Sequence, residues 1–91
     1  MRIAVRLGSG LTRLAGRSRL ELDLADGATV RDLLDRVAGE RPELSSGLSS
    51  VLTVVRGSQV ASDRVLSDGE EVALLIPISG GSERGARWRY R

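Results

Sequence analysis

The apolar residues of this 91-residue chain recur with two different periods, and the order of those periods limits the fold more than any other feature. Every second residue is apolar in "RIAVRL" at 2–7 and in "RLELDL" at 19–24, as in half-buried strands. A helical period follows at 29–42, and strand-like segments return at 51–56 and at about 71–76. The predicted element order is therefore β, β, α, β, β.

The helix between the two pairs of strands is the most clearly marked element. Thr29 is placed as its N-cap, and Asp32 three residues later predicts an imperfect capping box. Gly39 fits a helix stop, and Pro42 prevents the helix from resuming. The positions that share one helical face are apolar, and we expect them to be buried: Val30, Leu33, Leu34 and Val37.

The segments outside these patterns carry weaker signals. A single helical turn is predicted at 11–15, bracketed by Gly10 and Gly16. "LSSGLSS" at 44–50 is small and polar, which favours a flexible connection. "VLTVVR" at 51–56 is continuous and β-branched, as expected of a central strand.

The element order has a simple spatial solution. The first two strands form a hairpin, the helix crosses the sheet, and the last strand lies parallel to the first in the middle, with its C-terminal end projecting. The hairpin side chains expected to face inward are Ile3, Val5, Leu7, Leu20, Leu22 and Leu24. This is an α+β fold of the β-grasp (ubiquitin-like) type, with a mixed sheet of about four to five strands and one main helix packed across it. We expect one domain over 1–79 and a flexible tail over 80–91.

The composition excludes several kinds of chemistry. The chain has no Cys and no His, which removes disulfides, thiolate nucleophiles, imidazole bases and the usual zinc clusters, and we expect no metal site. All 14 basic residues are Arg, so no lysine can accept an isopeptide bond. No apolar run approaches the roughly 18 residues of a membrane span. Because Met1 leads directly into a strand pattern, we expect a cytoplasmic protein without membrane contact.

The basic charge is confined to the end of the chain. Residues 1–81 contain ten Arg and eleven acids, a net charge of −1, whereas residues 82–91 contain four Arg and one acid, a net charge of +3. Trp88 and Tyr90, the only aromatics, alternate with these Arg residues. This composition suits stacking on nucleic acid or contact with an anionic surface, and a segment without a fold of its own is the simpler interpretation.

The end of the last predicted strand carries the most specific motif. "VLSDGEEVALLIPISGG" at 65–81 places a turn, an apolar strand, a Pro and a Ser before Gly80 and Gly81. With "LAG", "ATVRDLLDRVA" and "VLTVV" earlier in the chain, this motif resembles the MoaD/ThiS family of ubiquitin-like sulfur carriers, which includes the small subunit of molybdopterin synthase. The resemblance runs over residues 1–81 without large gaps.

The resemblance implies a protein cosubstrate that is not itself an enzyme and binds no cofactor. An E1-like adenylating enzyme would use ATP to activate the carboxylate of Gly81, and a sulfur donor would convert it to a thiocarboxylate. Ser79, Gly80 and Gly81 would thread the narrow channel of that enzyme, since glycine has no Cβ. A sulfur-accepting enzyme, such as a molybdopterin synthase large subunit, would then take the sulfur.

The ten residues "SERGARWRYR" after Gly81 depart from the family, in which the glycine usually ends the chain. By comparison with carriers that a metalloprotease trims, the resemblance implies a precursor that is processed between Gly81 and Ser82. The alternative is a non-catalytic β-grasp binding module that uses its uncut basic tail to hold a protein or nucleic-acid partner. The pathway that receives the sulfur stays open: molybdopterin, thiamine, thiolated tRNA, cysteine or a secondary metabolite.

The apolar residues around the end of the last strand have two interpretations, core or docking surface. Strand alternation sends only part of the set inward, so we expect the remainder to form an exposed patch beside the tail for a partner. The set is Leu74, Leu75, Ile76 and Ile78. For the acids Asp68, Glu70 and Glu71, a charged turn is the simpler interpretation, and contact with a basic partner is the alternative.

Overall fold

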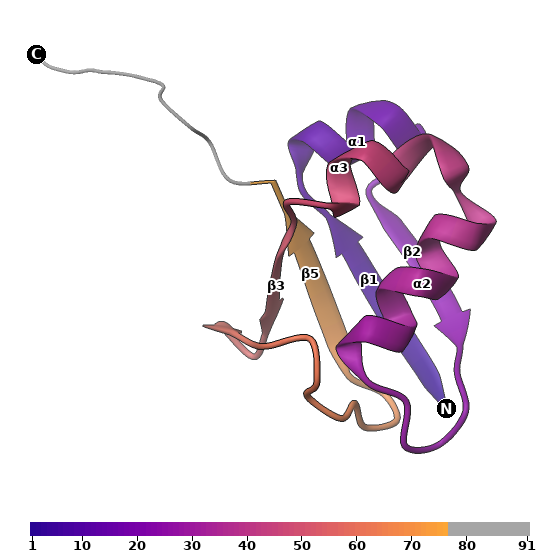
Figure 1. Ribbon diagram of the computed structural model, residues 1–91, viewed down its shortest axis with the longest axis vertical. Helices are drawn as coiled ribbons and strands as arrows, with labels where there is room; N and C mark the ends of the chain where they lie inside the picture. Colours follow the sequence, from indigo (N-terminus) through magenta and orange to yellow (C-terminus); the bar gives the residue numbers. More distant parts are fainter. Residues whose placement is uncertain (77–91) are drawn as a thin grey trace, which may run out of the picture.

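The computed structural model describes residues 1–76, and five strands in this part form one mixed sheet in the order β2-β1-β5-β3-β4. The strands are β1 (Arg2–Leu7), β2 (Arg19–Asp23), β3 (Leu52–Val55), β4 (Ser58–Gln59) and β5 (Glu71–Leu75). The helical segments are α1 (Ser9–Ala15), α2 (Val30–Glu40), the 3-10 helix η1 (Pro42–Leu44) and α3 (Ser45–Leu48). These helices cover one face of the sheet (Figure 1). The predicted α+β, β-grasp fold is confirmed.

The first and last strands lie side by side in the middle of the sheet. β1 pairs with β2 antiparallel and with β5 parallel, which places Val5 opposite both Leu20 and Val72. The expected parallel pairing of the first and last strands is therefore confirmed. β3 lies between β5 and the two-residue β4, so it is an interior strand, but the central position belongs to β5.

The core fills the space between the sheet and the helices. Every hairpin side chain expected to face inward is buried: Ile3, Val5, Leu7, Leu20, Leu22 and Leu24. On α2, Val30, Leu33 and Val37 are buried, while Leu34 packs against the core and is only partly covered. The predicted periods of the strands and of the helix are confirmed by this burial.

The start of α2 agrees with the sequence, but its end does not. The Thr29 hydroxyl oxygen accepts a hydrogen bond from the Asp32 N–H at 3.3 Å, and Asp32 Oδ2 accepts one from the Thr29 N–H at 2.9 Å, so the capping box is complete. The helix continues through Gly39 to Glu40, and the Arg41 N–H still donates to the Val37 carbonyl at 2.8 Å. The prediction of a stop at Gly39 is wrong because the helical hydrogen bonds continue past it.

Two segments are more helical than their sequences predict. The turn expected at 11–15 belongs to α1, which begins at Ser9 and therefore includes Gly10, while Gly16 ends it with a φ of 77°. The flexible connection expected at 44–50 is wrong, because this segment contains α3. Leu44 is completely buried, and this burial holds the segment on the core.

Candidate functional site

The end of β5 is the last part of the described chain before the glycine motif. β1 and β3 hold β5 on both sides, with β3 paired as far as Leu75. The Gly8 N–H donates a hydrogen bond to the Leu74 carbonyl at 2.9 Å. The strand therefore leaves the sheet from its centre, at the end where α1 and α3 lie (Figure 1).

The apolar residues at this strand end divide between core and surface. Leu74 is 0% exposed and belongs to the core, so its expected place in a docking surface is wrong, because strand alternation turns it toward the helices. Leu75 is 40% exposed and faces the other way. Ile76 is partly buried and packs against the core. The remaining predicted site residues lie outside the described part of the chain: Ile78, Ser79, Gly80, Gly81 and Ser82.

Beside Leu75, the helix-free face of the sheet carries further apolar side chains. β3 pairs with β5 so that Leu52 lies opposite Leu75 and Val54 lies opposite Ala73, and none of the four is fully buried. We call these four residues the outer sheet face. Val54 and Ala73 also line a hollow of about 450 Å³ whose charged lining residues include Arg6, Arg56 and Glu71. An apolar strip with a charged rim therefore lies next to the strand end, as in many protein interfaces.

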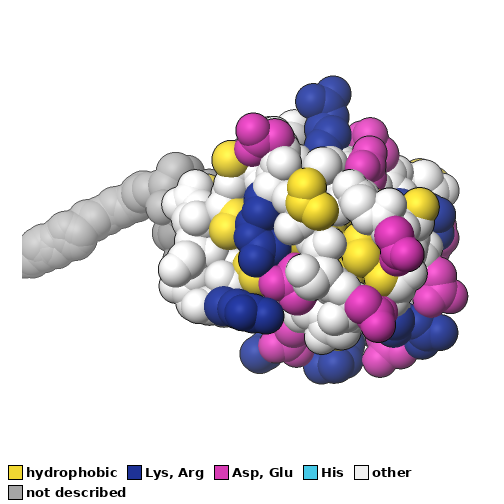
Figure 2. All heavy atoms as spheres, turned by 90° about the horizontal axis from the view of Figure 1, so that it is seen from below, with side chains coloured by type: hydrophobic (Ala, Val, Ile, Leu, Met, Phe, Trp, Pro, Cys, Tyr) yellow, Lys and Arg dark blue, Asp and Glu magenta, His cyan; other side chains and the backbone are white. Residues whose placement is uncertain are grey.

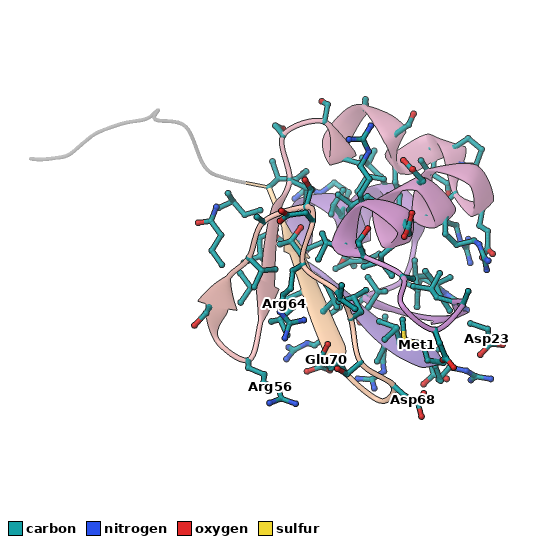
Figure 3. The ribbon with its side chains drawn as sticks, turned by 60° about the horizontal axis from the view of Figure 1, so that its bottom comes forward. Met1, Asp23, Arg56, Arg64, Asp68 and Glu70 are labelled. Atoms are coloured by element: carbon teal, nitrogen blue, oxygen red, sulfur yellow. The ribbon has the colours of Figure 1, made fainter. Side chains whose placement is uncertain are left out.

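Glu70, the residue just before β5, is a buried carboxylate at a position where the sequence predicts a charged turn. Its side chain is 5% exposed and accepts two hydrogen bonds from the Arg64 guanidinium, both at 3.0 Å, and one from the Ser67 N–H at 2.9 Å. Arg56 Nε lies 3.6 Å from Glu70 Oε2, and Figure 3 shows the three side chains gathered at this end of the strand. The expected turn is present, since the Glu70 N–H donates to the Ser67 carbonyl at 3.1 Å, but the sequence did not predict that this side chain is buried.

The protonation of Glu70 follows from these contacts. The hydrogen bonds from Arg64, and then that from Ser67, lower the pKa of Glu70 to about 2, although burial opposes this change. The hydrogen bonds between these two side chains also raise the pKa of Arg64 above its ordinary value. Glu70 is therefore a charged anchor that holds the loop around Arg64 to the start of β5, and the neighbouring Gly69 N–H donates to the Arg2 carbonyl of β1 at 2.9 Å. No spacing in the sequence signals such an anchor.

The end of the domain shown in Figure 2 carries charges of both signs. Arg and acidic side chains are interspersed there, with small apolar areas between them. Across the neighbouring strands β1 and β2, Arg2 contacts Glu21 at 2.9 Å and Asp23 at 2.7 Å. This face therefore lacks the extended positive surface on which nucleic-acid binding depends.

Two further kinds of site were sought in the described part of the chain. None of the helices within residues 1–76 has the length and apolar character needed to cross a membrane. The same residues do not bring three or more Asp or Glu side chains together in a group able to hold a metal ion.

Comparison with known proteins places this geometry in a family. The model of the ThiS family matches residues 5–81. The chain is 31% identical over 83 residues to the molybdopterin synthase sulfur carrier subunit of Chlamydomonas reinhardtii, covering 89% of this chain and 100% of that protein. It is 32% identical over 84 residues to small archaeal modifier protein 1 of Haloferax volcanii, covering 84% and 97%.

Solved structures agree with these sequence matches. A crystal structure of small archaeal modifier protein 1 from Haloferax volcanii is similar with a TM-score of 0.81 at 28% identity, covering 89% of this chain and 100% of that one. A molybdopterin converting factor subunit 1 from Pyrococcus furiosus, itself described as putative, gives a TM-score of 0.77 at 26% identity, covering 86% and 99%. The chain therefore belongs to the ThiS family, within the MoaD/ThiS group of ubiquitin-like sulfur carrier and modifier proteins.

Proposed function

We propose that this chain is the precursor of a sulfur carrier that works through the carboxylate of Gly81. Removal of residues 82–91 exposes this carboxylate, an activating enzyme adenylates it with ATP, and a sulfur donor converts it to a thiocarboxylate. The observation that carries the proposal is that the family match reaches Gly81 and ends there, so the ten residues after it are an addition to the family's pattern.

The chemistry explains why a free carboxylate is required. A carboxylate oxygen attacks the α-phosphorus of ATP and releases pyrophosphate, which makes AMP a good leaving group on the carbonyl carbon. Hydrosulfide released by the sulfur donor then attacks the carbonyl carbon, the bond from that carbon to the AMP oxygen breaks, and the thiocarboxylate remains. In the uncut chain the carbonyl of Gly81 is part of an amide bond, so it has no carboxylate oxygen to attack ATP. Gly80 and Gly81 lack Cβ, which supports an extended passage through a narrow channel.

The partners follow from this sequence of steps. An E1-like adenylating enzyme in the cytoplasm supplies the activation, a metalloprotease removes the tail, and a large subunit accepts the sulfur. A chain of this fold, with a TM-score of 0.66 at 18% identity, occurs in a solved complex of subunits 1 and 2 of the molybdopterin-converting factor from Helicobacter pylori. The outer sheet face, with Leu75 at the end of β5, supports docking of such a partner close to the reactive terminus.

A second candidate function uses the same activated carboxyl group. The relative from Haloferax volcanii is named a modifier protein, and a lysine of another protein could attack the Gly81 adenylate to form an amide. Because all 14 basic residues of this chain are Arg, its own side chains offer no lysine for such a bond. A modifier of this kind would form no chains through its own side chains.

Pyrophosphate exchange with a compatible activating enzyme and ATP tests the carboxylate assignment. The form that ends at Gly81 should support exchange, and the full chain should not, because its Gly81 carbonyl is joined to Ser82 in a peptide bond. Gly81→Val in the shortened form should fail through steric exclusion without loss of folding. Equal exchange by both lengths would refute the site.

Intact mass measurement on protein from its native host tests processing. Under demand for the sulfur product, we expect a species ending at Gly81, part of it heavier by the exchange of oxygen for sulfur. A conjugate to another protein would instead favour the modifier function. If every molecule retains Arg91, the carrier proposal fails and a binding module with an uncut tail becomes the better explanation.

A further inference from the structure

Three glycines surround the residues where β5 ends: Gly8 just before α1, Gly10 within α1 and Gly47 within α3. A Cβ added at Gly10 of α1 would lie 3.2 Å from Ile76 Cδ1. One added at Gly47 of α3 would lie 3.2 Å from the same atom and 2.9 Å from Leu11 Cδ2. One added at Gly8 would lie 3.0 Å from Leu75 Cδ2. All these distances are shorter than the roughly 3.5 to 4.0 Å of a normal carbon contact.

Backbone conformation does not explain two of these glycines. Gly10 and Gly47 lie inside helices, where glycine is less favourable than alanine, and neither has a positive φ. Gly39 of α2 is also inside a helix, but an added Cβ there would meet nothing within 4 Å. A side chain at Gly10 or Gly47 would therefore crowd Ile76, whereas a side chain at Gly39 would not.

We call the space that Gly10 and Gly47 leave for the Ile76 side chain its seat. This seat lies just after the last residue of β5 that pairs with a neighbouring strand. β5 ends at Leu75, and residue 77 is a proline, which has no N–H to donate to a neighbouring strand. Beyond the last paired residue, the packing of the Ile76 side chain against α1 and α3 thus fixes the chain to the domain without strand hydrogen bonds. Its contact atom, Cδ1, reaches between two helices that both pack on η1.

We infer that Gly10 and Gly47 are positioning residues that seat Ile76 and so set the place and direction in which the C-terminal segment leaves the domain. This inference rests on the proposed function, because its purpose is to present Gly81 to a partner. Gly81 follows Ile76 by five residues, which span at most about 18 Å when extended. When Ile76 is packed in its seat, the Gly81 carboxylate can reach no farther than this distance from Ile76.

The seat itself is tested on the full chain by methyl NMR. The δ1 methyl of Ile76 should show contacts to the α protons of Gly10 and Gly47. Gly10→Ala should shift this methyl resonance, because the new Cβ occupies its space, whereas the matched control Gly39→Ala should leave it unchanged. An unchanged Ile76 resonance in Gly10→Ala and in Gly47→Ala would overturn the inference without touching the proposed function.

The positioning role is tested by kinetics on forms ending at Gly81, whose folding the same methyl spectrum checks. Gly10→Ala should lower kcat of pyrophosphate exchange by roughly 10-fold or more, because the carboxylate is misplaced. The KM for the carrier should stay nearly constant, because the outer sheet face is intact. Gly39→Ala should behave like the unsubstituted form.

Rescue separates positioning from a general loss of structure. Ile76→Val removes Cδ1, the atom that the added Cβ would meet, so combining it with Gly10→Ala should restore most of kcat. The positioning role is wrong if the double variant stays as slow as Gly10→Ala. It is also wrong if neither Gly10→Ala nor Gly47→Ala changes kcat. If the unsubstituted form supports no exchange at all, the proposed function fails, and the methyl contacts still decide whether the seat exists.

Discussion

Replacing Glu70 by Gln should remove a pH-dependent part of the stability of this domain. The variant keeps the size of the side chain and leaves an oxygen that can accept from the Ser67 N–H. It removes the negative charge that faces Arg64 and Arg56 and turns amide hydrogens toward the Arg64 guanidinium. The expected result is a lower free energy of unfolding at neutral pH.

The size of the effect follows from the pKa of Glu70, which falls from an ordinary value of 4.5 to about 2 in the folded domain. At 1.36 kcal/mol for each pKa unit, this difference corresponds to at most about 3 kcal/mol. The Arg64 side chain is 32% exposed, so solvent screens the pair, and we expect a loss of about 1 to 2 kcal/mol.

The dependence on pH has a definite sign. The pKa of Glu70 is lower in the folded than in the unfolded chain, so its contribution is complete above about pH 4.5 and is lost as the pH falls toward about 2. Chemical denaturation at a series of pH values should show that the unsubstituted chain loses more stability over this window than Glu70→Gln does.

Glu71→Gln is the matched control for this measurement. Glu71 is the next residue, and its side chain is 46% exposed while it contacts Arg6 at 3.9 Å and Arg19 at 3.1 Å. Exposed pairs of this kind contribute little, so this variant should lose no more than about 0.5 kcal/mol. Parallel pH profiles for the unsubstituted chain and Glu70→Gln would refute the assignment of Glu70 as a buried charged anchor.

Three other changes test the core, the helix cap and the tail. Leu33→Ala, at a fully buried position of α2, should destabilise the domain by about 2 to 5 kcal/mol in denaturant unfolding, and a loss below 1 kcal/mol would contradict its burial. Thr29→Ala should cost about 1 kcal/mol through loss of the capping box, whereas Thr29→Ser should cost much less. Removal of residues 82–91 should leave the thermal midpoint nearly unchanged in calorimetry, because every described element precedes residue 77, and a drop of many degrees would contradict the separation of domain and tail.

The features that depend on neighbours within a few residues could be predicted from the amino-acid sequence alone. Alternating apolar residues predicted which side chains of β1 and β2 face the core, and the Thr29–Asp32 pair predicted where α2 begins. The order of these elements then led to the β-grasp fold, because a hairpin, a crossing helix and a returning strand have few ways to share one core. The glycine motif, with the resemblance it carried, came from the same local pattern.

How residues distant in sequence pack against one another became visible only in the folded domain. The structure showed that α2 continues past Gly39, that Leu74 is core while Leu75 is surface, and that Glu70 is buried against Arg64. Spacing leaves these outcomes open, because residues 72–76 are all apolar and show no alternation, and because the burial of a charge depends on which other segments cover it. Gly10 is the clearest case, since its lack of a side chain acquires a reason only when Ile76, 66 residues later, is packed against it.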